Sequence, residues 1–254
     1  NNNSIELSEQ EKRWIANHPK IRFTGDPNWL PYEGFNEHQE YIGIVSEYLQ
    51  LIEQKTGINF EIIYSKTWSE SVEKINSGTV DVISETYDAE LSSELIFTDS
   101  YLTSPIVIIM KNDQNYVENL SKIIDKKIAI IKNYGYVHKI RKAYPQMLFT
   151  DVDSIQSGLT AVSTGNVDAL IATLAQSSYY IAELGMNNVR IVGKTEFNTS
   201  LAFGVKKQYK PLVNILNRTL RAIEQREKQG ILDSWGKYDF ASKTDYSLVY
   251  KVLF

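Results

Sequence analysis

Short apolar runs alternate with amphipathic stretches along this chain, a pattern that predicts strands alternating with helices. The stretch SGTVDVIS at residues 77–84 returns as TGNVDALI at residues 164–171. In each copy a Gly closes an amphipathic stretch, as a left-handed residue after a helix does, and an apolar run typical of a buried strand follows. Upstream of each copy, a predicted strand begins with Lys-Ile, at Lys20 and at Lys127. We therefore expect two similar α/β lobes built on one plan.

Apolar residues also recur with the 3.6-residue period of helices at residues 43–55, 68–76, 154–164 and 209–229. A short helix is expected at residues 7–17, where a Ser and a Glu have capping-box spacing. Two unbroken apolar runs, at residues 104–111 and 200–205, predict strands buried on both faces. Because these two strands would join the lobes, the first lobe should be discontinuous in sequence.

The domain organisation that follows has four parts. We expect a lead-in helix in residues 1–19, lobe 1 in residues 20–110 and 201–240, lobe 2 in residues 111–200, and a separate C-terminal segment in residues 241–254. In open α/β sheets, ligands bind outside the carboxyl ends of the strands. Loops of both lobes should thus line one crevice, and hinge closure is the expected motion.

Composition excludes several function classes. The net charge of −4 offers no basic surface for nucleic acid, and the absence of cysteine excludes thiol chemistry and disulfides. His18, His38 and His138 lack the spacing of a metal site. Neither a nucleophile elbow nor a phosphate loop occurs. We expect no catalytic residues, no metal and no cofactor.

Six stretches carry a family resemblance, and together they cover nearly all of residues 20–237. They are DPNWLPYEG (26–34), YIGIVSEYLQLIEQKTG (41–57), SGTVDVIS (77–84), FTDSYLTSPIVII (97–109), KIAIIKNYGY (127–136) and GNVDALIATLA (165–175). In this order they resemble the bacterial extracellular solute-binding proteins of family 3. The resemblance implies the type 2 periplasmic-binding-protein (Venus flytrap) fold, an α/β architecture of two lobes with two hinge crossovers and a central ligand cleft.

The flanks of the chain suggest a receptor. LSEQEKRWIANHPKIRF (7–23) resembles the lead-in of Venus flytrap domains in sensor histidine kinases, and TDYSLVYKVLF (244–254) resembles a segment running into a transmembrane helix. Aromatic residues followed by aliphatic ones suit a membrane interface, although the segment could instead pack on its own domain. The resemblance implies a periplasmic sensor domain, anchored to the inner membrane in the full-length protein. The full-length receptor could form a homodimer. One alternative is a solute-binding protein of an ABC transporter, and a less favoured one is an enzyme on this fold.

In lobe 1 the resemblance points to aromatic ligand contacts. Trp29 matches a loop aromatic that stacks on the ligand, with Asp26 and Tyr32 nearby; Tyr32 could instead belong to the core. Trp68 matches another cleft position, although a helix-packing role explains it equally well.

The residues after the strand at 80–84 depart from the family pattern. The family has Thr-x-x-Arg here, and its Arg clamps the ligand carboxylate, but Leu91 stands at that position and no Arg occurs between Arg22 and Arg141. Thr173 replaces the acid that would hold the ligand ammonium. Ordinary α-amino acids are therefore not the expected ligands. The ligand-binding candidates in this stretch are Ser84, Glu85, Thr86 and Tyr87, with Asp88 beside them.

In lobe 2 the candidates follow the strand at 127–131. Gly135 stands where the family presents backbone N–H groups at a helix N-terminus, which favours anions, and Lys132 could assist. Tyr134 and Tyr136 add aromatic rings.

The expected partner is a small polar solute. Acidic side chains such as Glu85 and Asp88, combined with aromatic rings, suit an amine-bearing ligand or a neutral polar one. Alternatively, these acids form a solvated turn and the cleft binds nothing.

Overall fold

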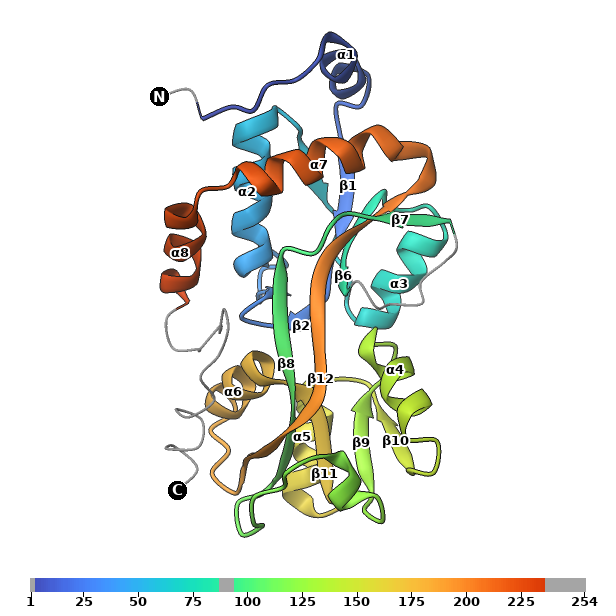
Figure 1. The fold of residues 1–254 in the computed structure, drawn as a ribbon, viewed down its shortest axis with the longest axis vertical. Helices are drawn as coiled ribbons and strands as arrows, with labels where there is room; N and C mark the ends of the chain where they lie inside the picture. The colour runs from blue at the N-terminus through green and yellow to red at the C-terminus, as the bar shows by residue number, and fades with distance from the viewer. Residues whose placement is uncertain (1–2, 87–93, 236–254) are drawn as a thin grey trace. The chain divides into compact units, whose positions relative to one another are not determined.

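The structure is a computed structural model that describes residues 3–86 and 94–235 (Figure 1). The described residues divide into two compact units: unit 1 comprises residues 3–86, 94–102 and 201–235, and unit 2 comprises Thr103–Ser200. Strands β8 (Leu102–Lys111) and β12 (Val189–Lys206) each run from one unit into the other. Unit 2 begins at Thr103, earlier than the expected start at residue 111. The expected C-terminal segment at 241–254 lies outside the described residues.

Unit 1 contains a mixed parallel and antiparallel sheet with helices, together with a separate small antiparallel sheet. The main sheet has the order β5-β1-β6-β12, and β7 also pairs with β12. The small sheet has the order β2-β3-β4 and lies between β1 and α2 in the sequence. The elements are α1 (Glu9–Asn17), β1 (Ile21–Thr24), β2 (Asn28–Trp29), β3 (Glu33–Phe35), β4 (Tyr41–Ile42), α2 (Ile44–Thr56), β5 (Phe60–Ile62), α3 (Trp68–Asn76), β6 (Val82–Thr86), β7 (Leu95–Phe97), a 3₁₀ turn at Lys207–Tyr209, α7 (Lys210–Ala222) and α8 (Gln225–Ser234).

Local sequence signals fix several boundaries in unit 1. The capping box predicted for the first helix is present, since Ser8 Oγ accepts from the backbone N–H of Glu11 and the Glu11 carboxylate accepts from that of Ser8. Gly57 ends α2 in the left-handed conformation, with φ of 78°.

The strands of unit 2 follow the order β10-β9-β11-β8, with β12 next to β8; β10, β9 and β11 are parallel, and β8 is antiparallel to β11. Every residue of β9 and β11 is buried, as expected for strands covered on both faces. Its elements are a 3₁₀ helix η1 (Leu120–Ile123), β9 (Ile128–Ile131), α4 (Tyr136–Ala143), β10 (Phe149–Val152), α5 (Ile155–Thr164), β11 (Ala169–Thr173) and α6 (Leu174–Glu183).

The sequence repeat corresponds to a repeated set of backbone contacts. The backbone of Asp81 donates to the Arg22 carbonyl at 2.8 Å, and its carboxylate accepts from the Arg22 N–H at 2.9 Å. Asp168 makes the same two contacts with Lys127, both at 2.8 Å. The pairing therefore equates Arg22 with Lys127, so the alignment of the two Lys-Ile pairs was wrong by two residues.

The single long helix predicted at residues 209–229 is also wrong. The chain leaves the helical conformation at Ile223, whose ψ is 120°. Glu224 then opens α8, because its side chain accepts from the third residue of the new helix while the Glu227 carboxylate accepts from the Glu224 N–H. The apolar stripe continues through this break, which is why the pattern did not reveal it. Gly230, which directly follows the predicted range, lies inside α8.

Candidate functional site

The predicted ligand-binding residues fall into one set in each unit. In unit 1, Asp26, Trp29 and Tyr32 lie in the segment joining β1 to β3, and all three are buried, with exposed fractions of 3%, 5% and 2%. The rings of Trp29 and Tyr32 lie 4.8 Å apart. Asp26 Oδ1 accepts from the backbone N–H of Asn28 at 2.8 Å. The segment is thus a packed aromatic cluster with an internal hydrogen bond.

Sequence reasoning missed Glu33, which is completely buried in the same segment. Its carboxylate accepts from the backbone N–H of Asp26, and a Cβ added to Gly25 would fall 1.9 Å from its Oε1. Burial, followed by the charge of Glu33, raises the pKa of Tyr41 and of Tyr101 well above the usual value for tyrosine. The carboxylate therefore fixes the start of this segment from inside unit 1.

The remaining unit 1 candidates lie at the starts and ends of regular elements. Trp68 opens α3 and is 6% exposed. Ser84 is buried in β6, opposite Phe203 of β12. Glu85 and Thr86 continue β6, paired with Ala202 and Leu201 respectively. Tyr87 and Asp88 lie outside the described residues.

In unit 2 the structure brings a ring and an amide together. Tyr134 and Tyr136 are buried, their rings are 5.8 Å apart, and Gln176 Nε2 donates to the Tyr134 hydroxyl at 3.0 Å. Gln176 is fully buried in the first turn of α6 and was not predicted. A polar residue just after a buried strand was the available signal.

Three further unit 2 candidates lie at helix starts or on the surface. Gly135 precedes α4 at its N-cap position, and Thr173 does the same for α6. Thr173 is fully buried, whereas Lys132 is exposed. The unit 2 candidates therefore lie at two helix N-termini, beside a buried amide–phenol hydrogen bond.

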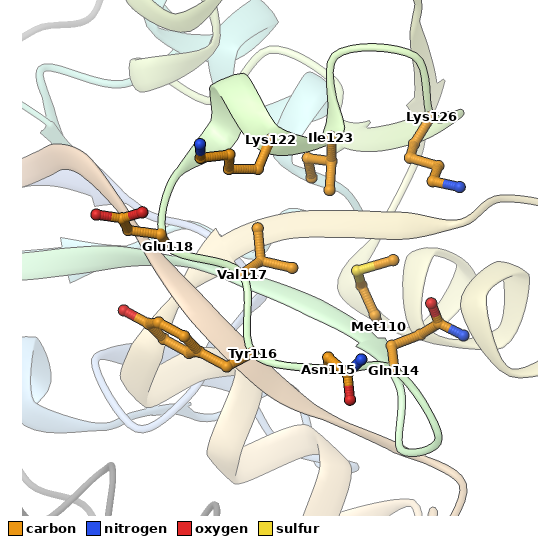
Figure 2. Close-up of a pocket in the computed structure, with 9 residues that line it drawn as sticks. All are labelled: Met110, Gln114, Asn115, Tyr116, Val117, Glu118, Lys122, Ile123 and Lys126. Carbon is orange, nitrogen blue, oxygen red and sulfur yellow. The ribbon is translucent and has the colours of Figure 1, made fainter.

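A separate hollow of about 450 Å³ lies on unit 2 (Figure 2). Met110, Val117 and Ile123 are its buried residues, and the others are at least partly exposed. Val117 is held against β12 by its N–H, which donates to the Val192 carbonyl at 3.0 Å. None of the predicted site residues lines this hollow. Its lining is Met110, Gln114, Asn115, Tyr116, Val117, Glu118, Lys122, Ile123 and Lys126.

Comparison with known families settles the relationship of this chain. Residues 21–238 match the model of the bacterial extracellular solute-binding proteins, family 3. The chain belongs to this family. Membership confirms the resemblance inferred from the six stretches and identifies the chain as a solute-binding domain rather than an enzyme.

Sensor proteins are among the most similar relatives. The chain is 26% identical over 242 residues to the virulence sensor protein BvgS of Bordetella bronchiseptica, covering 94% of this chain and 20% of that protein. It is 28% identical over 240 residues to the sensor protein EvgS of Escherichia coli K12, covering 93% and 20%. The ABC transporter arginine-binding protein 1 of E. coli K12 is 21% identical, covering 85% and 90%. The chain thus spans about a fifth of the length of the sensor relatives.

A solved structure supports the same relationship. The periplasmic VFT2 domain of Bordetella pertussis BvgS superposes with a TM-score of 0.82 at 25% identity, covering 91% of this chain and 99% of that one. The predicted two-lobed type 2 fold is therefore confirmed, as is the similarity to Venus flytrap domains of sensor kinases. Within residues 3–86 and 94–235, no helix is long and apolar enough to cross a membrane.

Proposed function

We propose that this chain is the periplasmic ligand-sensing domain of a membrane-anchored sensor histidine kinase. The observation that carries the proposal is the contrast among relatives. The two sensor proteins match 94% and 93% of this chain at 26% and 28% identity, whereas the transporter component matches 85% at 21%. The matching region is a fifth of each sensor protein but 90% of the transporter component. The greater similarity to the sensor proteins therefore favours a receptor module over a free binding protein.

The proposed ligand is a small polar solute that is amine-bearing or neutral. No Arg lies between Arg22 and Arg141, so this region offers no guanidinium for bidentate binding of a carboxylate. The described candidates instead offer rings, an amide, hydroxyls and carboxylates, with the ammonium of Lys132 on the surface. Aromatic faces attract cations, and the Tyr134–Gln176 pair offers hydrogen bonds to a neutral group.

The proposed mechanism is a shift between two arrangements of the units. A ligand favours the arrangement it binds more tightly, and a shift from 1:99 to 99:1 requires about a 10⁴-fold difference in affinity. The change would pass through the C-terminal segment to a membrane helix, and the receptor could act as a homodimer.

The coding sequence around this chain and the activity of its product test the receptor role. We expect a hydrophobic span after Phe254 and kinase activity in the full-length product that changes when solute is added. A product that ends near Phe254 without a hydrophobic span would contradict the receptor role and support the transporter alternative.

A further inference from the structure

Helix α8 lies against α2 in an antiparallel arrangement within unit 1 (Figure 1). At one end of the contact, Lys55 Nζ lies 3.2 Å from Glu227 Oε1. At the other end, Trp235 Nε1 donates to Glu47 Oε2 at 2.8 Å. The two ends of α2 are thus tied to the first turn of α8 and to Trp235, the residue that follows α8.

Little apolar surface holds α8 in place. Ile231 is the single buried residue of α8, whereas α7 buries five. Because apolar burial is the main force that packs a helix onto a domain, α8 should be attached more weakly than α7. Its polar contacts therefore make up a larger share of its attachment.

Lys55 is the centre of the polar contact. Its side chain is only 2% exposed, and a buried ammonium is tolerated only when it is paired. Lys55 Nζ also donates to Asn3 Oδ1 at 2.9 Å, and Asn3 Nδ2 donates to Glu227 Oε1 at 2.9 Å. The backbone N–H of Ile5 donates to the Lys55 carbonyl at 3.0 Å. The N-terminal segment, α2 and α8 therefore meet at one residue.

We propose that Lys55 is a latch that couples the docking of the N-terminal segment to the docking of α8. Loss of α8 from its site removes Glu227, so Asn3 keeps only one of these two contacts. Loss of the N-terminal segment likewise takes one partner from both Lys55 and Glu227. The latch links the segment before the first strand to the last described helix. Its role in signalling rests on the proposed function, but the coupling is a property of the ligand-free domain.

Hydrogen exchange in the ligand-free chain tests the coupling. Glu227→Gln removes the charge but keeps the side-chain size. We expect at least about tenfold faster exchange in α8 and at the Ile5 amide, with α7 and the sheet of unit 1 unchanged. The matched control is Arg226→Gln on the same helix, because Arg226 is 82% exposed and pairs only with an exposed Glu224 among the described residues. It should leave both sites unchanged.

A second variant loosens α8 without touching the buried charge. Trp235→Phe removes the indole donor to Glu47, which lies at the opposite end of α8 from Asn3. The latch predicts that the Ile5 amide exchanges faster in this variant too. The proposal is overturned if α8 exchanges faster while Ile5 does not, if α8 keeps its wild-type rate in Glu227→Gln, or if all of unit 1 accelerates together. Coupled exchange in a domain that binds no solute would retain the latch and reject the proposed sensing function.

Discussion

Asp81 and Asp168 occupy the same position in the two copies of the repeat, yet replacing each by Asn should have different effects. Both carboxylates accept from a backbone N–H, that of Arg22 in β1 for Asp81 and that of Lys127, just before β9, for Asp168. Asp81 is 1% exposed and also contacts Arg22 Nη2 at 3.1 Å and Lys206 Nζ at 2.5 Å, whereas Asp168 is exposed. The comparison separates the contribution of the buried charge cluster to the free energy of unfolding from the contribution of the shared backbone contact.

The size of the effect follows from burial. Removing one partner of a buried ion pair costs about 3–5 kcal/mol. Arg22 and Lys206 are 39% and 24% exposed, so water can partly solvate them, and Asn retains an acceptor for the backbone N–H. We expect Asp81→Asn to lower the free energy of unfolding by about 2–3 kcal/mol. Asp168→Asn should change it by about 0.5 kcal/mol or less.

Urea unfolding can read the two units separately. All four Trp residues, Trp14, Trp29, Trp68 and Trp235, belong to unit 1, so Trp fluorescence reports that unit while far-UV circular dichroism reports both. With a slope of about 1–3 kcal/mol per molar urea, Asp81→Asn should lower the fluorescence midpoint by about 1 M. Equal shifts of the unfolding midpoint measured by far-UV circular dichroism for Asp81→Asn and Asp168→Asn would refute the assigned role of the buried cluster.

The comparison of wild type with Asp81→Asn also predicts how the stability depends on pH. Burial alone would raise the pKa of Asp81, but hydrogen bonds from Arg22 and Lys206 outweigh it and hold the pKa below its usual value. A lowered folded-state pKa gives stability that is present above the unfolded pKa, about 3.9, and is lost as the pH falls through the folded value. The stability gap between wild type and Asp81→Asn should be constant at neutral pH and close below about pH 4.

Two further comparisons test local geometry and the choice of site. Gly193→Ala should destabilise unit 2 by about 1–3 kcal/mol, because a Cβ there would lie 1.9 Å from the Val117 carbonyl oxygen. Gly230→Ala should instead stabilise unit 1 by about 0.4–1 kcal/mol, because a Cβ inside α8 at this position meets no atom within 4 Å apart from the helix's own backbone. Thermal unfolding followed by circular dichroism checks the sign of both changes. Trp29→Phe should weaken solute-induced stabilisation while Tyr116→Ala, at the hollow of unit 2, leaves it intact. The reverse result would move the ligand to that hollow.

The fold was accessible from sequence because its signals are local. A Gly stop followed by Val-Asp and an apolar run recurs in both units, and each Asp makes the contacts described above. The alignment of Arg22 with Lys127 between the two units could not be predicted from the sequence. It is set by the tertiary hydrogen bonds of Asp81, which pair with Arg22 and not with Lys20. The break at Ile223 was hidden for a related reason, because a buried apolar residue fits a continuous helix as well as a turn.

The site was only partly accessible, because polar burial leaves no periodic pattern. Trp29 and Tyr134 were singled out from loops that follow strands, as the family resemblance suggested. Glu33 and Gln176 were missed because a charged residue and an amide in such positions are usually solvated. Only tertiary packing shows that they are fully buried.

The most direct test of the proposed ligand sensing is a thermal-shift screen of the chain against polyamines, amino acids, carboxylates and small sugars. A solute at about 100 times its dissociation constant stabilises the folded state by about 2.7 kcal/mol, which is readily measured as a shift in melting temperature. We predict stabilisation by an amine-bearing or neutral polar solute, with the shift reduced in Trp29→Phe. Stabilisation by ordinary α-amino acids would contradict the ligand class, and no stabilisation by any solute would contradict ligand sensing itself.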